Sequence, residues 1–139
     1  MRRVTLVFTL VLPLLAAGCG DDPQTATSAS APATIVTDTF TGTVDRNGAT
    51  SHPFPIVSSA GGEVTVTIKS IAPETASVVG MSLGTWNGTS CVAVISNDRA
   101  IVSTSILGRA TATGTLCVRI FDSGSLTGPQ DYEVQAVHP

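Results

Sequence analysis

The chain has few aromatic and few charged residues. Aromatic side chains make up 4% of its 139 residues and charged side chains 12%, with 7 basic residues against 10 acidic ones. This balance leaves no basic surface that would attract nucleic acid or anionic lipid. No apolar run reaches the roughly 20 residues that a transmembrane helix needs. These absences leave a mildly acidic chain with room for one domain of ordinary size.

Helical periodicity is also missing, and strand periodicity takes its place. The clearest case is the segment 63–71, in which Val64, Val66 and Ile68 alternate with polar residues. Alternation with a period of two predicts a strand with one buried face and one face in solvent. Thr, Val and Gly are frequent elsewhere in the chain, as in all-β proteins.

Eight such segments follow one another at a spacing of roughly 8 to 12 residues. They cover residues 39–44, 49–57, 63–71, 77–86, 89–95, 100–107, 111–122 and 130–137. This pattern predicts an all-β fold, an antiparallel two-sheet β-sandwich of about eight strands with a jelly-roll-like arrangement.

Turn residues refine this prediction. Asn47-Gly48 and Asn87-Gly88 are expected to form type I′ hairpin turns, whose two central residues both have positive φ. Pro53 and Pro55 cannot donate to a ladder, so their strand is expected at a sheet edge.

The N-terminal segment has the organisation of an export signal. Arg2 and Arg3 precede an apolar run, which ends in small residues before Cys19. The stretch Leu15-Ala16-Ala17-Gly18-Cys19 resembles the lipobox of bacterial lipoproteins, with Ala16 where that family prefers Leu. The resemblance implies cleavage before Cys19 by signal peptidase II and a lipid anchor on that cysteine. An ordinary secretory signal with an incidental cysteine is the alternative.

The predicted organisation therefore has three parts. Residues 1–18 are a signal peptide, residues 19–37 are the lipidated cysteine with a Ser/Thr/Ala/Pro-rich tether, and residues 38–139 are the sandwich domain. Such a protein sits in the bacterial cell envelope with its domain outside the cytoplasm. The sequence leaves open which membrane carries the anchor.

Cys91 and Cys117 are the two cysteines that remain after Cys19. An even pair in an oxidising compartment favours a disulfide, which would close a loop of about 27 residues and stabilise the fold by about 3.5 kcal/mol. Two free buried thiols are the alternative. The pair has no neighbouring His to complete a metal site, and we predict neither a metal nor a cofactor.

Several segments resemble the bacterial pre-peptidase C-terminal (PPC) domain over roughly residues 38 to 137. They are the stretches 40–44, 62–67, 114–119 and 131–134, together with Phe54. The family is a jelly-roll-like β-sandwich that accompanies secreted enzymes, so the resemblance implies a non-catalytic binding or stabilising role. Ser51-His52-Pro53 stands where the family often has acidic residues, so no calcium site is carried over.

No group of residues has the pattern of a catalytic site. His52 is expected at the surface and His138 in a mobile terminus, and no Gly-x-Ser-x-Gly motif accompanies them. A calcium ion between Asp122 and Asp131 is conceivable, but no calcium-loop motif is present. The sequence therefore predicts a protein that is not an enzyme.

Trp86 is the single tryptophan, and it precedes a predicted hairpin tip. It is a candidate ligand contact if exposed, or a cross-strand residue that shields the hairpin. We expect a membrane-anchored, non-catalytic envelope lipoprotein whose sandwich contacts another envelope protein. The alternative is a carbohydrate- or peptidoglycan-binding module. Its expected partners are the membrane and an envelope protein or glycan, and not nucleic acid.

Overall fold

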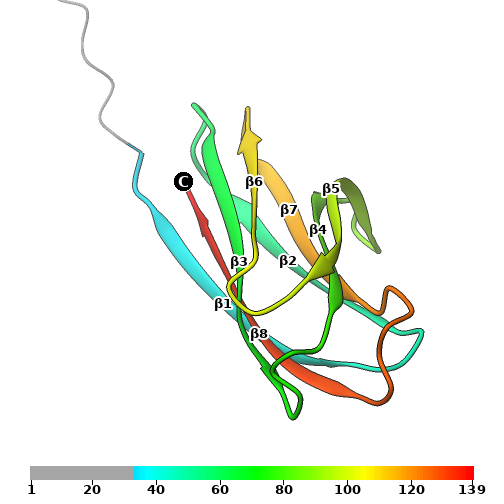
Figure 1. Ribbon diagram of the computed structural model, residues 1–139. Coiled ribbons are helices and arrows are strands. Elements are labelled where there is room, and N and C mark those ends of the chain that lie inside the picture. Colours follow the sequence, from blue (N-terminus) through cyan, green and yellow to red (C-terminus); the bar gives the residue numbers. More distant parts are fainter. Residues whose placement is uncertain (1–32) are drawn as a thin grey trace, which may run out of the picture. The chain divides into compact units, whose positions relative to one another are not determined.

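Eight strands, one for each alternating segment, make up the fold (Figure 1). The computed structural model describes residues 33–139. The signal peptide, Cys19 and most of the predicted tether lie outside the described residues. In chain order the strands are β1 (Val36–Val44), β2 (Ala49–Ile56), β3 (Gly62–Ala72), β4 (Val79–Trp86), β5 (Cys91–Ala100), β6 (Ser105–Ala110), β7 (Gly114–Phe121) and β8 (Gln130–His138).

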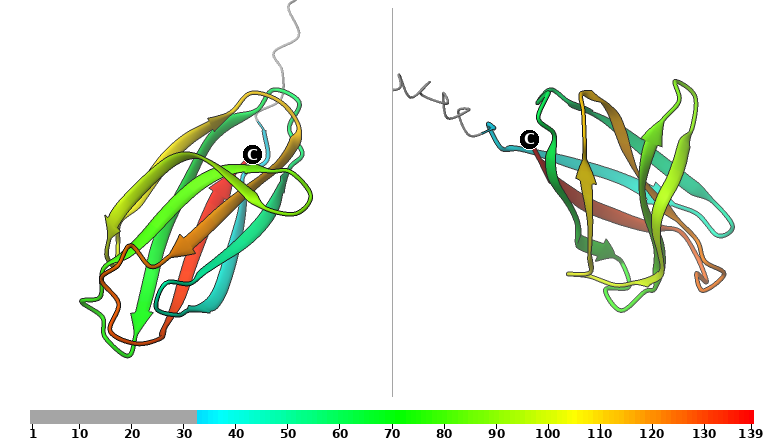
Figure 2. Two further views of the ribbon diagram at one scale, coloured as in Figure 1. Left: turned by 90° about the vertical axis from the view of Figure 1, so that its right-hand side faces the viewer. Right: turned by 90° about the horizontal axis from the view of Figure 1, so that it is seen from above.

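The strands form two antiparallel four-stranded sheets, which confirms the predicted sandwich. One sheet has the order β1-β8-β3-β6 and the other the order β2-β7-β4-β5. These orders bring strands from both ends of the sequence together in each sheet, as in a jelly roll. The edge strands β1 and β2 lie on one side of the sandwich, and β6 and β5 lie on the other (Figures 1 and 2).

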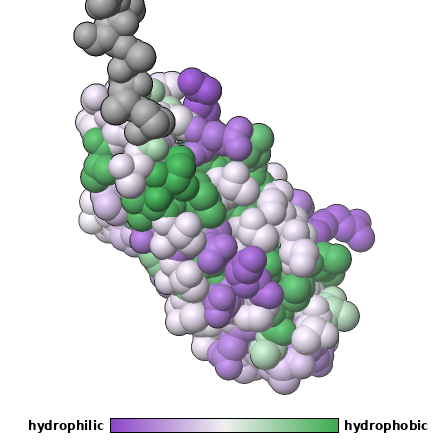
Figure 3. Space-filling view, turned by 90° about the vertical axis from the view of Figure 1, so that its left-hand side faces the viewer, coloured by the Kyte–Doolittle hydropathy of each residue, from purple (hydrophilic) through white to green (hydrophobic). Residues whose placement is uncertain are grey.

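The period-two pattern decides which side chains form the core. Strand β8 alternates between buried and half-buried positions along most of its length, and β3 does so along its first half. The buried apolar set is dominated by Val and Ile and includes Phe54, Met81 and Tyr132. On the face in Figure 3 hydrophilic and apolar groups are interspersed, and one apolar patch lies next to the start of the described chain.

Most strand boundaries differ from the predicted ones by one to three residues, and those of β5 and β6 by up to five. β1 begins at Val36, inside the last residues assigned to the tether, because Val36 pairs with His138 of β8. The predicted strand end at residue 95 is wrong, since β5 continues through Ser96-Asn97-Asp98 to Ala100 while pairing with β4, and β6 begins only at Ser105. The turn instead occupies residues 101–104, where the Thr104 amide donates to the Ile101 carbonyl at 3.0 Å. Ladder pairing outweighed the local turn preference of Ser-Asn-Asp.

Both type I′ predictions are wrong. At the first turn only Asn47 has positive φ, at 61°, and the Gly48 amide donates to the Asp45 carbonyl at 2.8 Å. One positive φ at the third position fits a type II turn, whereas type I′ needs two. At the second turn only Gly88 has positive φ, and the Asn87 side chain accepts the amides of Thr89 and Ser90.

The proline prediction is confirmed. β2 contains Pro53 and Pro55 and is an edge strand of its sheet. Both prolines are exposed, while Phe54 between them is 1% exposed and reaches the core. The edge position removes the need for the amide hydrogen that proline lacks.

The predicted disulfide between Cys91 and Cys117 is present, with the Cα atoms 5.7 Å apart. Cys117 alternates with the core-facing Leu116 and Val118, so it leaves β7 on the outer face of the sheet. Because β4 lies between β5 and β7, the bond links the two strands on either side of β4. Gly84 of β4 pairs with Cys117, and a Cβ there would lie 2.0 Å from the Val92 carbonyl oxygen, so β5 bends closely over β4.

We expect the Cys91→Ala/Cys117→Ala double variant to be less stable by about 3.5 kcal/mol, because its unfolded chain regains the entropy that the disulfide removes by closing a loop of about 27 residues. For a domain of this size that loss lowers the Tm by roughly 10 to 20 °C. Thermal unfolding followed by circular dichroism measures the change. An unchanged Tm would show that the bond adds no stability.

Candidate functional site

The side of the sandwich between β1 and β2 is filled by an aromatic and histidine cluster. Phe40 of β1 stacks on His52 of β2, with ring centroids 5.1 Å apart. Phe54 contacts both Phe40 and the ring of His138, at centroid distances of 6.2 and 4.8 Å. The two histidines, far apart in the sequence, therefore belong to one packed cluster that joins the two sheets.

His138 is buried, and the prediction of a mobile terminal residue is wrong. Its side chain is 2% exposed, and its Nε2 atom lies 3.0 Å from Asp38 Oδ2 on β1. Its Nδ1 atom is 3.4 Å from the Pro139 carbonyl oxygen. Strand pairing between β1 and β8 places these residues together, so the contact fastens the last strand to the first. With both ring nitrogens next to protein groups and almost no exposure, His138 is placed to hold strands together.

His52 is half-buried, so the prediction of a surface residue is also wrong. Its Nε2 atom lies 2.7 Å from the Tyr132 hydroxyl. Burial lowers the pKa of His52 below its usual 6.5 and raises the pKa of Tyr132. Each shift favours the uncharged form, so at neutral pH a neutral imidazole and a neutral phenol share this hydrogen bond.

Asp122 and Asp131 do not form a shared site. The Asp122 carboxylate accepts the backbone amides of Asn47, Gly124, Ser125 and Leu126, and these bonds lower its pKa, that from Asn47 most. Asp131 instead accepts the Thr43 hydroxyl at 2.5 Å. Among residues 33–139 no three His, Cys, Asp or Glu side chains form a group that could hold a metal ion.

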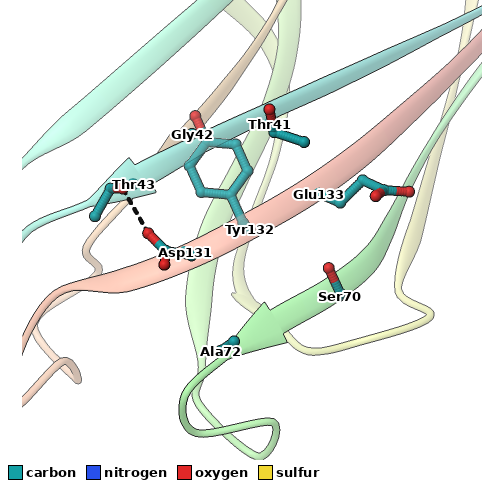
Figure 4. A pocket seen from close by; sticks show the side chains of 8 residues that line it. All are labelled: Thr41, Gly42, Thr43, Ser70, Ala72, Asp131, Tyr132 and Glu133. Carbon is teal, nitrogen blue, oxygen red and sulfur yellow. Dashed lines mark hydrogen bonds between the residues drawn. The ribbon is translucent and has the colours of Figure 1, made fainter.

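A polar hollow of about 410 Å³ lies on the outer face of the sheet that contains β1, β8 and β3. Asp131 and Glu133 project into it from the same face of β8, while Tyr132 between them points to the opposite side (Figure 4). Thr43 and Ser70 add hydroxyl groups to its lining. Two carboxylates at strand spacing are common on solvated sheets, and they do not by themselves make a site.

The opposite side of the sandwich, between β5 and β6, contains an apolar cleft of about 240 Å³. Its lining comes from Leu83 on β4, Ile95 on β5 and Leu116 on β7, with Gly108 of β6 at the other wall. A Cβ at Gly108 would lie 2.7 Å from Leu83, so the absent side chain keeps this part open. The β5–β6 cleft is therefore lined mainly by apolar groups where the two sheets separate.

Exposed apolar side chains surround the β5–β6 cleft. Val92 and Val94 of β5 are 50% and 72% exposed, and Val94 lines the cleft. Leu107 of β6 is 57% exposed but lies on the outer face of its sheet, because Ile106 and Gly108 on either side of it face inward. The register passes from Leu83–Ile95 to Gly84–Ala93, which leaves Val94 as the extra residue of a β-bulge. Within the described chain no strand pairs with the outer edge of β5 or of β6. Both edges thus offer unpaired backbone groups beside an apolar surface.

The remaining candidate residues have different outcomes. Trp86 is half-buried and directly opposite Cys91 across the β4–β5 hairpin, which fits the interpretation that it shields the hairpin. Its role as a ligand contact stays a prediction. Cys19 lies outside the described residues. The β5–β6 cleft was not foreseen from the sequence, although the apolar run Val92-Ala93-Val94-Ile95 interrupts the alternation and could have signalled it.

Comparison with solved structures finds the same kind of fold. The Yersinia pseudotuberculosis-derived mitogen is 17% identical, with 73% of this chain and 84% of the mitogen covered and a TM-score of 0.52. PliG, a periplasmic inhibitor of g-type lysozyme from Aeromonas hydrophila, gives the same identity and coverage with a TM-score of 0.45. At this identity the likeness extends to the fold alone. No protein-family model matches the sequence, and no curated protein does.

The disulfide agrees with a domain outside the cytoplasm, because such bonds persist in oxidising compartments. Within residues 33–139 there is no helix with the length and apolar character needed to cross a membrane.

We expect stability to decrease as the pH falls through and below about 6.5, the usual pKa of His52. In that range the unfolded chain binds a proton at this residue and the folded domain does not, so protonation favours unfolding. In His52→Gln this part of the pH dependence is lost, and losing the bond to Tyr132 costs about 1 kcal/mol at neutral pH.

Urea unfolding of the wild type and of His52→Gln between about pH 5 and 8 measures how the free energy of unfolding depends on pH. In this range histidine is the side chain that ordinarily titrates. Parallel pH profiles for the wild type and His52→Gln would contradict the assignment of this titration to His52.

Proposed function

We propose that this protein is a lipid-anchored, non-catalytic envelope protein that binds an extended segment of another envelope protein at the β5–β6 cleft. The segment adds to the free edge of β5 and places an apolar side chain in the cleft. The observation that carries the proposal is the combination of an unpaired edge strand with exposed apolar residues beside it.

Backbone and side-chain chemistry both support this kind of partner. An extended segment satisfies the unpaired amide and carbonyl groups of an edge strand, and pockets beside the edge select its side chains. Val92 and Val94 would lose contact with water on binding. The domain offers little charge at this place, with Arg109 as the charged residue in the lining, so burial of the surface desolvates few charges.

A catalytic role has less support from the described residues. His52 is bonded to Tyr132, and His138 is bonded to Asp38 and enclosed in the core. The alternative of a carbohydrate-binding module relied on Trp86 as an exposed platform, and its half-burial opposite Cys91 weakens that argument. The resemblance to PPC domains stays a proposal, and its implied binding role is compatible with the one described here.

We expect the Val92→Lys/Val94→Lys double variant to lose its protein partner, because both residues are exposed on edge strand β5, and Val92 lies opposite Thr85 of the cleft lining. Lysine at an edge strand places a charge in the surface that the partner must cover. Chemical cross-linking in intact envelopes, followed by purification and mass spectrometry, measures the yield. We expect a decrease of about tenfold relative to wild type, which corresponds to about 1.4 kcal/mol of binding free energy.

Ile101→Lys is the matched control, because Ile101 is an exposed apolar residue at 48% that does not line the cleft. All three exposed positions should tolerate lysine within about 0.5 kcal/mol of stability. Equal cross-linking by wild type and the double variant would contradict docking at the cleft. Retention of glycan in place of a protein would favour the carbohydrate-binding alternative.

The anchor has its own test in the mature protein. We expect intact mass spectrometry of the membrane fraction to give an N-terminus at Cys19 with added diacylglyceryl mass. In Cys19→Ala the lipid acceptor is missing, so the protein should leave the membrane fraction or keep its signal peptide. A wild-type N-terminus at another residue, without acyl mass, would contradict the lipoprotein assignment.

A further inference from the structure

The two ends of the sandwich differ in charge. The connections at the end where β1 begins cover residues 57–61, 87–90 and 111–113, and none of them contains a charged residue. Three of the four connections at the opposite end contain acidic residues, namely Asp45, Glu74 and Asp122, and one of them also contains the basic residue Arg46. The connections at the far end therefore carry a net negative charge, and those at the tether end carry none.

Two of the uncharged connections form one continuous surface. Gly61 has φ of 64°, and a Cβ there would lie 2.1 Å from the Ala110 carbonyl oxygen, so the β2–β3 connection rests directly on the end of β6. Gly62 also packs closely, since a Cβ there would lie 2.9 Å from Pro139 Cγ. Figure 2 shows both connections at the end where the described chain begins.

Exposed apolar and hydroxyl groups dominate this surface. Ile35 and Val57 are 63% and 69% exposed, and an apolar patch lies next to the start of the described chain in Figure 3. The remaining residues of the two connections are small and carry hydroxyl groups or no polar side chain. We call Ile35, residues 57–61 and residues 111–113 the tether-end surface.

We propose that the tether-end surface rests on the interfacial region of the lipid bilayer; this inference relies on the lipid anchor of the proposed function. The Ser/Thr/Ala/Pro-rich composition of residues 19–35 predicts a span of about 22 Å, so an anchored Cys19 would keep this end of the domain beside the membrane. Tethering at that distance makes even a weak contact effective, because the local concentration is high.

The chemistry of the surface suits a bilayer interface. Ile35 and Val57 offer apolar groups that leave water, while the serine and threonine hydroxyls of the loops can bond head groups. No charged residue of the loops loses hydration. Of the nearest charged groups, Asp38 is bonded to His138, and Glu63 is in register with Arg109 on the neighbouring strand. The acidic far end points away from anionic lipid, which would repel it.

The β5–β6 cleft opens beside the tether-end surface. Gly108 and Arg109 of its lining come just before residues 111–113, at the end of β6. The tether joins β1, which is an edge strand, and β6 is the opposite edge of the same sheet, so the cleft lies at the sheet edge farthest from the tether.

The test uses the full lipidated protein in phosphatidylcholine vesicles with a fluorophore on a single added cysteine. Ser59→Cys labels the exposed β2–β3 connection, and Thr127→Cys labels an exposed position at the far end. A nitroxide lipid with its spin label near the head group is the quencher. We expect strong quenching of the fluorophore at position 59 and little at position 127. When Ile35→Ser and Val57→Ser are added, quenching at position 59 should fall to the level at position 127.

Co-sedimentation of the same samples separates the two proposals. Protein that sediments with the vesicles but is quenched equally weakly at positions 59 and 127 overturns the membrane contact and leaves the anchor intact. Protein that does not sediment overturns the anchor and the contact together. Quenching at 59 that is unchanged by the two serine substitutions overturns the role of Ile35 and Val57.

Discussion

Burial of one apolar face per strand is the constraint on which this domain depends. Val and Ile dominate the buried apolar set and the chain has few aromatic residues, so branched aliphatic side chains supply most of the core. Two sheets must therefore face each other, and the core closes only when strands from both ends of the sequence join the same sheet. The pairing of β1 with β8 is the clearest result, since it brings Asp38 to His138.

The two open sides of the sandwich are treated differently. Between β1 and β2 the gap is filled by aromatic rings and by the rings of His52 and His138, so this side is closed. Between β5 and β6 the gap holds the apolar cleft, and the edges beside it keep exposed valines and a leucine. The unsealed side is the one at which we propose that a partner binds, and the bulge at Val94 limits unspecific pairing along β5.

Local clamps hold the parts that the core does not reach. The Cys91–Cys117 bond fixes edge strand β5 to β7 across β4, and the Asp122 carboxylate ties the β7–β8 connection to the turn after β1. Neither clamp lies at the tether-end surface, where backbone packing at Gly61 brings the connections together instead. The domain thus presents two neighbouring surfaces, the tether-end surface and the β5–β6 cleft, the second at the sheet edge away from β1.

The sequence by itself determined the fold class, the number of strands, the core-facing residues of β3, the edge position of β2 and the cysteine pair, because period-two alternation, proline and cysteine arithmetic are local signals. It misplaced the turn after β5, both hairpin turn types and the environments of His52 and His138. It also did not reveal the β5–β6 cleft. Only the tertiary structure decided these features, because each depends on a neighbour distant in the sequence. Pairing with β4 extends β5 through a turn-forming segment, and His52 and His138 are held by Tyr132 and Asp38. The cleft forms where β5 of one sheet faces β6 of the other.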